Sequence, residues 1–428
     1  MDLIPRHLTA KVARTLQTSR VINIVGPRQT GKTTLVRDML QTARFLNLDD
    51  EGLMSSLALD PFGQLSMVAA EAEKAGLPVV IDEVQRLPQI TLALKRIVDQ
   101  DRRPGQFVLT GSSDVFTTPK ALDSLAGRVS TLTLRPLSAA EIQRQGPCLL
   151  LNAVHDDPAA LIGTLPPPPP FGRADAIELI IRGGFPEIRP LNGAERMERY
   201  NAYIGSIVER DVAPVAEIRR PDTLRRLINQ LAHRTADELN VASICAALGA
   251  RKETVTGYLD ILSRLGIVHR LGAWTSSGAR KEVRSPKLHF MDMGCATALR
   301  GEDTASFGVG ANPTALGHLL ESLVFCELEK SLPFLDRKWE LYHWRNAPRE
   351  VDIVAEAPGR VLALFEMKAS MTVDWNDFRH VDWFLKDGPG HAYKGVAFVV
   401  YLGDKVLSFG PGRVALPLSM LWSYPISP

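Results

Sequence analysis

The sequence GPRQTGKT at residues 26–33 constrains the fold of this chain more than any other stretch. It fits the pattern GxxxxGK[ST] at every position, follows the β-branched run Val21–Val25 and leads into a helix expected over 34–40. Glycines let backbone N–H groups close around phosphate oxygens, and a helix N-terminus adds partial positive charge. The order of strand, loop and helix therefore predicts a P-loop in a parallel α/β sheet.

The side chains of this loop have separate expected roles. Lys32 should reach the β- and γ-phosphates of a nucleotide, and the hydroxyl of Thr33 should bind Mg²⁺. The other nucleotide-binding residues expected here are Gly26, Pro27, Arg28, Gln29, Thr30, Gly31 and Thr34. ATP and Mg²⁺ are therefore the predicted cofactors.

Two acids end the next strongly apolar segment, at 77–83. Open α/β sheets bind ligands beyond the carboxyl ends of their strands. We expect Asp82 to hold Mg²⁺ through water, and Glu83 to act as the general base that polarises the attacking water. The alternative is that both acids only cap a helix that starts near Leu87.

Two further residues are candidates for sensing or stabilising the γ-phosphate. Ser112 follows a fourth expected strand, at 106–110; the alternative is a plain Gly-Ser turn. Arg128 follows a short helix and is a candidate arginine finger, acting within the chain or on a neighbouring subunit. The second option leaves a homo-oligomer open; the competing interpretation of Arg128 is a surface salt bridge.

Composition indicates a globular, intracellular chain. With 428 residues it is long enough for two to four domains, and it is 45% hydrophobic and 23% charged. No apolar run reaches the ~18 residues of a membrane span, and residues 1–16 lack the apolar centre of a signal peptide. Four cysteines lie far apart, which is typical of reduced buried thiols. We expect a cytoplasmic location and no membrane partner.

The middle of the chain is basic and has the pattern of a winged helix-turn-helix. Residues 219–290 hold 13 Lys and Arg against 6 Asp and Glu. Two helices at 241–248 and 254–265 flank a tight turn, and an alternating hairpin follows. The predicted nucleic-acid contacts are Arg251, Lys252, Arg264, Arg280 and Lys281. The expected partner is duplex DNA, bound through its phosphates; the alternative is a packing module between two domains.

A second group of charged residues lies near the C-terminus. Asp352 and the sequence Glu366-Met367-Lys368 give the spacing D-x13-ExK on two strands joined by a turn, and Glu321 lies on an upstream apolar helix. Residues two apart on a strand face the same side, and a turn of about five residues would place Asp352 opposite Glu366.

This pattern resembles the PD-(D/E)XK nuclease fold. The resemblance implies Mg²⁺ held by Glu321, Asp352 and Glu366, with Glu366 and Lys368 as catalytic residues. One alternative is a nuclease fold without activity, whose charges are satisfied as salt bridges. The other is a hairpin unrelated to nucleases.

Several strings in one order resemble a family of bacterial and archaeal AAA-type ATPases that carry a helix-turn-helix and a C-terminal domain of largely uncharacterised function. The strings are IPRH, GPRQTGKTTL, VVIDEVQ, LTGSS, SLAGR and RGGFPE. The resemblance implies a helical lid after the ATPase core, with Pro186 of the last string facing the nucleotide. Residues 146–172 depart from the family pattern, and we expect a surface loop there because of the five-proline run; a docking site for a partner is the alternative.

The prediction is therefore a multidomain α/β chain in four parts. These are an AAA-type P-loop core at 1–140, a lid at 141–215, a winged helix-turn-helix at 216–292 and a nuclease-like domain at 293–428. The predicted function is Mg²⁺-dependent ATP hydrolysis coupled to nucleic-acid binding, with a Mg²⁺-dependent nuclease in the last domain. The alternative is an ATP/ADP switch that binds a protein partner and carries an inactive nuclease-like domain.

Overall fold

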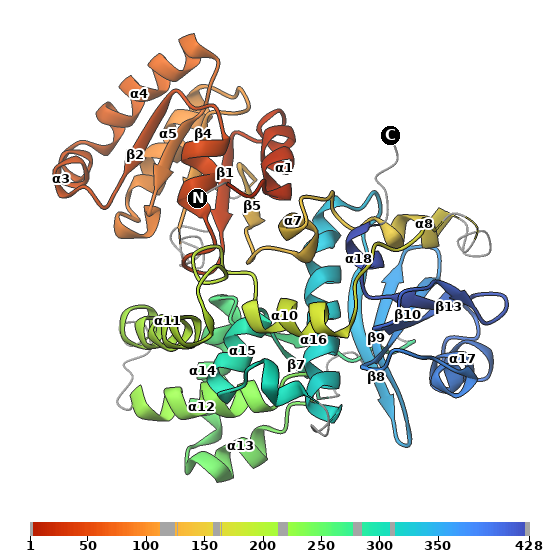
Figure 1. Cartoon of the computed structure of the whole chain (residues 1–428). Helices are drawn as coiled ribbons and strands as arrows, with labels where there is room; N and C mark the ends of the chain where they lie inside the picture. The colour runs from red at the N-terminus through yellow and green to blue at the C-terminus, as the bar shows by residue number, and fades with distance from the viewer. Residues whose placement is uncertain are drawn as a thin grey trace. The chain divides into compact units, whose positions relative to one another are not determined.

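The computed structural model of the chain divides into two compact units (Figure 1). The first unit comprises Met1–Pro136 and Arg264–Gly266, and the second comprises Leu137–Ser263 and Ile267–Pro428. The structure describes residues 3–111, 125, 127–156, 163, 165–212, 221–276, 285–308 and 313–423.

A parallel sheet forms the centre of the first unit. Its strand order is β2-β3-β4-β1-β5, and every neighbouring pair is parallel. The strands are β1 (Val21–Val25), β2 (Arg44–Asn47), β3 (Val79–Asp82), β4 (Phe107–Thr110) and β5 (Val129–Thr133). The parallel α/β core predicted from the sequence is confirmed.

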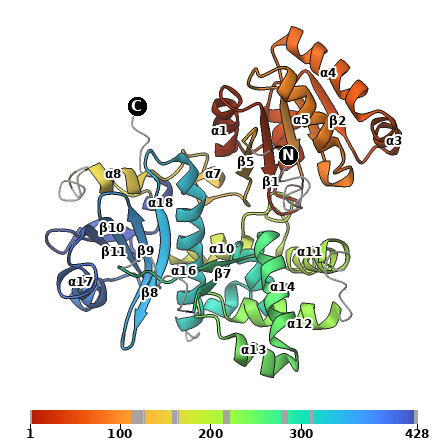
Figure 2. The same cartoon turned by 180° about the vertical axis from the view of Figure 1, so that it is seen from behind.

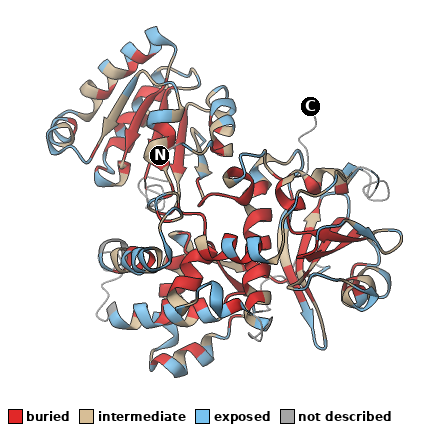
Figure 3. Cartoon of the chain, in the orientation of Figure 1, coloured by how far each residue is buried: buried red, intermediate tan, exposed pale blue. Residues whose placement is uncertain are grey.

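Helices cover both faces of this sheet, which explains why its strands are apolar without alternation. The helical elements are α1 (His7–Leu16), α2 (Lys32–Thr34), η1 (Leu35–Met39), α3 (Glu51–Leu59), α4 (Pro61–Ala75), η2 (Val84–Arg86) and α5 (Ile90–Gln100). Ile81 and Leu109 pack on the α3–α5 side. Val80 and Val108 pack on the side of α1 and the P-loop helix. The central strands are accordingly buried, as Figure 3 shows.

The P-loop helix differs in detail from the prediction. It is helical from Lys32, but Leu35–Met39 forms a π-helix rather than an α-helix. Leu35 and Val36 are its buried residues, so the apolar side of this segment still faces the sheet.

The second unit begins with a mainly helical part. Its elements are α7 (Ala139–Ile142), α8 (Leu150–Asp156), α10 (Arg173–Arg182), α11 (Gly193–Ser206), η4 (Ile207–Val212), α12 (Pro221–His233), α13 (Val241–Leu248), α14 (Lys252–Arg264), β6 (Val268–Leu271), β7 (Lys287–Phe290), α15 (Met293–Arg300) and η6 (Thr304–Phe307). The predicted helix, turn, helix and hairpin occur in this order as α13, α14, β6 and β7. β6 and β7 pair antiparallel.

A six-stranded mixed sheet dominates the C-terminal part of the second unit, in the order β12-β13-β11-β10-β9-β8. The elements are α16 (Pro313–Ser331), η7 (Leu332–Phe334), β8 (Glu340–Asn346), β9 (Arg349–Ala357), β10 (Val361–Lys368), η8 (Trp375–Phe378), α17 (Arg379–Lys386), β11 (Lys394–Tyr401), β12 (Leu407–Ser408), β13 (Arg413–Pro417) and α18 (Met420–Ser423). Figures 1 and 2 show α16 on one side of this sheet and α17 on the other.

The prediction that 146–172 is a plain surface loop is wrong for part of this segment. It contains α8, in which Leu150, Leu151 and Val154 are buried. The proline-rich end also contacts the C-terminal helix, because Phe171 packs edge-on against Trp422 with ring centroids 4.8 Å apart. An apolar face on α8 and an aromatic after the prolines therefore fix this segment to the second unit.

No helix in the described ranges is both long enough and apolar enough to cross a membrane.

Candidate functional site

The P-loop leaves β1 in a backbone path that few residue types can follow. Gly26 has φ +148°, and a Cβ there would overlap the carbonyl oxygen of Leu134. Gln29 and Gly31 also have positive φ, at 60° and 92°. Glycine adopts such angles without steric cost, so the two glycines of the motif are explained by this path.

Backbone carbonyls and side chains hold the loop closed. The ammonium of Lys32 donates to the carbonyls of Gly26 and Pro27, at 2.9 and 2.8 Å. The hydroxyl of Thr30 donates to the same Pro27 carbonyl, at 2.8 Å. These hydrogen bonds therefore hold the ammonium of Lys32 against the P-loop. Phosphate oxygens can take the place of the two carbonyls as acceptors.

Asp82 connects the P-loop to two neighbouring strands. It lies at the end of β3 and is 2% exposed. Its Oδ2 accepts a hydrogen bond from Thr33 Oγ1 at 2.8 Å, and its Oδ1 accepts from Thr110 Oγ1. A hydroxyl and a carboxylate in contact form an oxygen donor set that fits Mg²⁺. Thr33 and Asp82, predicted as metal-binding residues, are thus brought together.

Thr110 was missed by the sequence reasoning. It is the last residue of β4, which lies between β1 and β3 in the sheet. The signal available in the sequence was a hydroxyl at a strand end, and it directed attention to Ser112 two residues later. Ser112 lies outside the described residues.

Glu83 stands beside this group on a strained backbone. Its φ is 57°, in the left-handed region that non-glycine residues seldom adopt. Its Oε2 accepts a hydrogen bond from the side-chain amide of Gln85. The capping alternative is not supported, since the N-cap of α5 is Gln89 and Glu83 makes no side-chain cap to η2.

Arg6 is a second residue that the sequence reasoning left without a role. It precedes α1, is 7% exposed, and donates to two backbone carbonyls, those of Thr30 and Arg135, both at 2.6 Å. The planar guanidinium bridges the P-loop and the segment after β5 with a fork that lysine could not reproduce. Arg6 therefore fixes the P-loop backbone at Thr30 relative to the segment after β5.

Arg128 is engaged within its own unit. Its guanidinium donates to both carboxylate oxygens of Asp99, at 2.5 and 3.0 Å. Arg20 lies 3.7 Å from the same carboxylate. This ion pair is what the salt-bridge interpretation of Arg128 predicts. The arginine-finger role stays a prediction and would require Arg128 to leave Asp99.

The string RGGFPE has a structural role inside the second unit. Gly183 has φ +64°, and a Cβ there would collide with Asp292 and Tyr200. Asp292 accepts hydrogen bonds from Gly184 N at 2.6 Å and from the Tyr200 hydroxyl at 3.0 Å. Pro186 belongs to this unit and the P-loop to the other, so its contact with the nucleotide stays a prediction.

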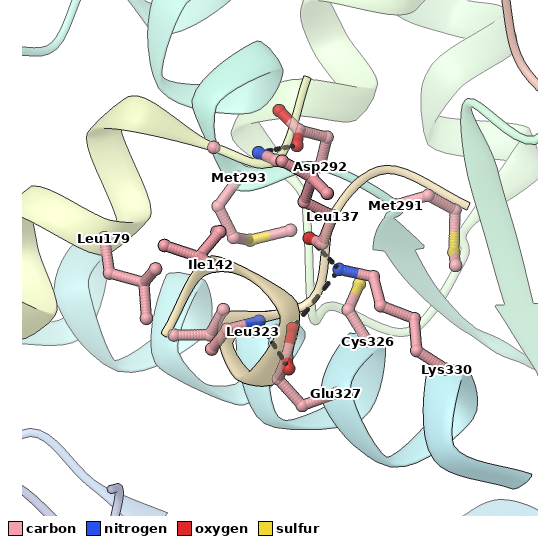
Figure 4. A pocket seen from close by; sticks show the side chains of 13 residues that line it. Leu137, Ile142, Leu179, Met291, Asp292, Met293, Leu323, Cys326, Glu327 and Lys330 are labelled. Atoms are coloured by element: carbon pink, nitrogen blue, oxygen red, sulfur yellow. Dashed lines mark hydrogen bonds and ion pairs between the residues drawn. The ribbon is translucent and has the colours of Figure 1, made fainter. Parts of the chain in front are cut away.

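Next to this turn, α16 contacts the segment with which the second unit begins (Figure 4). Glu327 accepts from the backbone N–H of Ala139 at 2.8 Å, and Lys330 donates to the carbonyl of Leu137 at 3.0 Å. Lys330 also pairs with Glu327, at 3.2 Å. The buried charges on this side of α16 are thus satisfied by one another and by the N-terminus of α7.

The predicted nucleic-acid residues are only partly described. Arg251, Lys252 and Arg264 are exposed, at the start and the end of α14. The opposite face of α14 is buried through residues that include Val255 and Leu262. Arg280 and Lys281 lie outside the described residues.

The carboxylates of the second unit converge as the strand pattern predicts. The register Ile353↔Phe365 between β9 and β10 places Asp352 beside Glu366. Asp352 Oδ2 also accepts from the backbone N–H of Met367, at 3.0 Å. Lys368 donates to Glu366 Oε1 at 3.1 Å.

Lys287 enters this group from β7 and was not foreseen. Its ammonium lies 2.6 Å from Glu321, 2.7 Å from Glu350 and 3.5 Å from Asp352, and its side chain is 2% exposed. Burial disfavours its charge, but the three carboxylates outweigh this and raise its pKa. The sequence signal was a lysine in a strand whose other residues are buried.

The cluster does not fit a divalent cation in this arrangement. Among the described residues, no group of three or more His, Cys, Asp or Glu side chains is disposed to hold a metal ion. An ammonium stands among the carboxylates instead. The metal roles predicted for Glu321, Asp352 and Glu366 are therefore not supported by the geometry.

One oxygen of the cluster has no partner. Glu366 Oε2 is buried and accepts no hydrogen bond from the described residues. Burial, and secondarily the charge of Asp352, raise the pKa of Glu366 to about 8. A cavity of about 370 Å³ adjoins the group and is lined by residues that include Glu321, Asp352 and Glu366.

Three family models match parts of the chain. Residues 18–143 match an AAA domain. Residues 173–306 match a domain of unknown function (DUF8612), and residues 316–421 match another (DUF4143). The match to the AAA domain covers the P-loop, Asp82 and Glu83.

Similar proteins include uncharacterized proteins of Mycobacterium bovis and Mycobacterium tuberculosis. Each is 29% identical over 370 residues, which cover 86% of this chain and 74% of the relative. Among solved structures, the Walker-type ATPase of Pyrococcus abyssi is 15% identical, with a TM-score of 0.40, and the match covers 70% of this chain and 96% of that one. A signal transduction ATPase with numerous domains from Pyrococcus horikoshii is 13% identical, with a TM-score of 0.28 over 76% and 48% of the chains.

Proposed function

We propose that residues 18–143, which match an AAA domain, hydrolyse ATP with Mg²⁺, and that the chain couples hydrolysis to the binding of duplex DNA by helix α14. The observation that carries the proposal is the contact of Asp82 with Thr33 of the P-loop and Thr110 of β4. These three side chains lie where the carboxyl ends of the strands meet the phosphate-binding loop.

Each residue of the nucleotide site has a defined task. Thr33 and Asp82 would hold Mg²⁺, which when bound neutralises charge on the β- and γ-phosphates. Lys32 exchanges its bonds to the Gly26 and Pro27 carbonyls for bonds to phosphate oxygens. Glu83 accepts a proton from the attacking water. The hydrogen bond from Gln85 holds the Glu83 carboxylate in place for this role.

The DNA part of the proposal is supported by exposed charge on α14. Arg251 and Lys252 are exposed at the N-terminal end of this helix, and Arg264 at its C-terminal end. Cations on an exposed helix bind DNA phosphates with weak sequence preference and strong dependence on salt. We therefore expect affinity for duplex DNA of mixed sequence.

The carboxylate cluster favours a second candidate over the predicted nuclease. In it, ATP and ADP states of the first unit switch the second unit between forms with different affinity for a protein partner. The nuclease-like part then has no catalytic role, because its carboxylates are paired with Lys287. Glu366 and Lys368, predicted to be catalytic, would serve as a structural ion pair.

DNA binding is tested with the triple variant R251A/K252A/R264A. Fluorescence anisotropy with a labelled duplex at low salt should show a loss of affinity, with a shallower salt dependence than in the wild type. The matched control is R337A/K338A/K394A, which removes three exposed cations from the C-terminal part of the unit. Equal affinity of the two triple variants would refute the role of α14.

The coupling is tested by ATP hydrolysis with and without duplex DNA. Stimulation in the wild type, absent in the α14 triple variant, supports the proposal. The protein-partner switch is favoured if the rate of ATP hydrolysis is the same with and without DNA, and if linear, branched and single-stranded DNA are not cleaved in Mg²⁺.

A further inference from the structure

The ammonium of Lys287 lies inside a group of carboxylates that come from two other elements. Glu321 projects from α16, and Glu350 and Asp352 project from β9. The three carboxylates lie within 3.5 Å of one nitrogen atom. Several oxygens around one cation is also the arrangement by which proteins hold Mg²⁺ or Ca²⁺.

The backbone fixes Lys287 in this position. Lys287 pairs with Leu271 across the β6–β7 hairpin. Leu288 N, the next donor along β7, bonds to the carbonyl of Asp237 at 2.9 Å. His289, on the same strand, shares a hydrogen bond with Ser322 of α16, at 2.9 Å. The strand that carries Lys287 is therefore anchored to the helix that carries Glu321.

A divalent cation at these oxygens would compete with the ammonium of Lys287. Burial raises the pKa of the Glu321 carboxyl, and the adjacent Lys287 acts in the opposite direction. Three buried or half-buried carboxylates of this kind are stable only with a compensating positive charge. Lys287 supplies it through the chain itself, so a divalent cation must displace the ammonium to reach these oxygens.

We propose that Lys287 is a tethered counter-cation that closes the Glu321–Glu350–Asp352 cluster to divalent metal ions. The β6–β7 hairpin thereby holds the C-terminal part of the chain in a form that cannot assemble a metal centre. Glu366 lies outside the three ion pairs of Lys287, and its Oε2 is buried with no partner among the described residues. The inference does not depend on ATP hydrolysis or on DNA binding.

Manganese binding to the full chain tests the proposal. Mn²⁺ is titrated into protein that has been washed with EDTA, and the concentration of free Mn²⁺ is measured by electron paramagnetic resonance. Because the P-loop also binds divalent cations with nucleotide, all proteins are free of nucleotide and carry T33A. We expect no site at the cluster with Lys287 present, and one additional equivalent bound in K287A. The variant K287R keeps a cation and should bind none.

Removal of Lys287 leaves buried carboxylates unpaired, so K287A is expected to be less stable. The double variant K287M/E321Q removes one charge of each sign and keeps Glu350, Asp352 and Glu366. It should fold and bind one equivalent of Mn²⁺, with affinity reduced at least about tenfold when D352N is added. ATP hydrolysis by the same variants with Thr33 restored reports separately on the first unit.

Two results would overturn the proposal. One is binding of Mn²⁺ at the cluster of the protein that retains Lys287, shown by its loss in D352N. The other is a folded K287M/E321Q chain that binds no more Mn²⁺ than the parent protein. Either result would show that Lys287 only forms buried ion pairs and does not exclude divalent cations.

Discussion

Asp82 links the P-loop to β4 in the proposed nucleotide site. Its two carboxylate oxygens accept from hydroxyls on either side, Thr33 in the P-loop and Thr110 on β4. A ligand to a metal is oriented by the hydrogen bonds that its other oxygen makes. Thr110 therefore acts on the site through Asp82 and is a positioning residue.

Replacement of Thr110 tests this role. T110V keeps the shape of the side chain but removes the donor to Asp82, so we expect ATP hydrolysis to fall by about 10–100-fold. Binding of ATP should change little, because Thr110 is not part of the phosphate-binding loop. Steady-state hydrolysis and equilibrium nucleotide binding measure the two effects. T110S keeps the hydroxyl and is the control; wild-type turnover in T110V would remove Thr110 from the account.

Arg6 supports a second prediction at this scale. R6A removes two hydrogen bonds, to the carbonyls of Thr30 and Arg135, and each hydrogen bond from a charged donor contributes about 1.5–3 kcal/mol. We expect weaker ATP binding, measured by titration calorimetry, and only partial recovery in R6K. The control is R14A, an exposed arginine on α1. Equal losses in R6A and R14A would show that the effect is not specific to the P-loop.

Individual elements differ in how far their sequences predict them. The strand, loop and helix around 21–39 are local, since glycines, a β-branched run and a GK[ST] string suffice to define them. The pairing of Asp352 with Glu366 was also predictable, because strand alternation and a short turn determine it. The π-helical turn at Leu35–Met39 was not, since it depends on packing against the sheet.

Long-range contacts account for what the sequence did not predict. Lys287 approaches Glu321 and Glu350 from 34 and 63 positions away along the chain, and no local pattern distinguishes it from a wing residue that faces DNA. Thr110 gains its role only from the insertion of β4 between β1 and β3. Arg6 resembles any basic residue before a helix until the segment after β5 is in place.

The α8 helix yields a prediction at the level of elements. Leu150 is fully buried although it lies in a segment that the sequence indicates to be a loop. L150A should lower the free energy of unfolding of the second unit by about 2–5 kcal/mol, because truncation of a buried leucine leaves a cavity. Chemical denaturation measures this, with exposed Asp156 changed to Ala as the control. A loss under about 0.5 kcal/mol, the usual effect of a surface substitution, would restore the loop interpretation.

At the scale of the whole molecule, the two units differ in what they can do. The first combines an AAA domain match with hydrogen bonds of Asp82 to Thr33 and Thr110, and of Lys32 to two P-loop carbonyls. The second matches two domains of unknown function and holds a carboxylate cluster paired with Lys287. The proposed activity of the protein is therefore ATP hydrolysis in the first unit, with binding rather than cleavage in the second.

Hydrolysis of ATP by the wild type and by E83Q tests this account most directly. We expect phosphate release by the wild type in Mg²⁺, none in excess EDTA, and a loss of about 100-fold or more in E83Q, which still binds Mg²⁺-ATP. Hydrolysis by E83Q at the wild-type rate, or a folded wild-type protein that binds ATP but releases no phosphate with or without DNA, would contradict it.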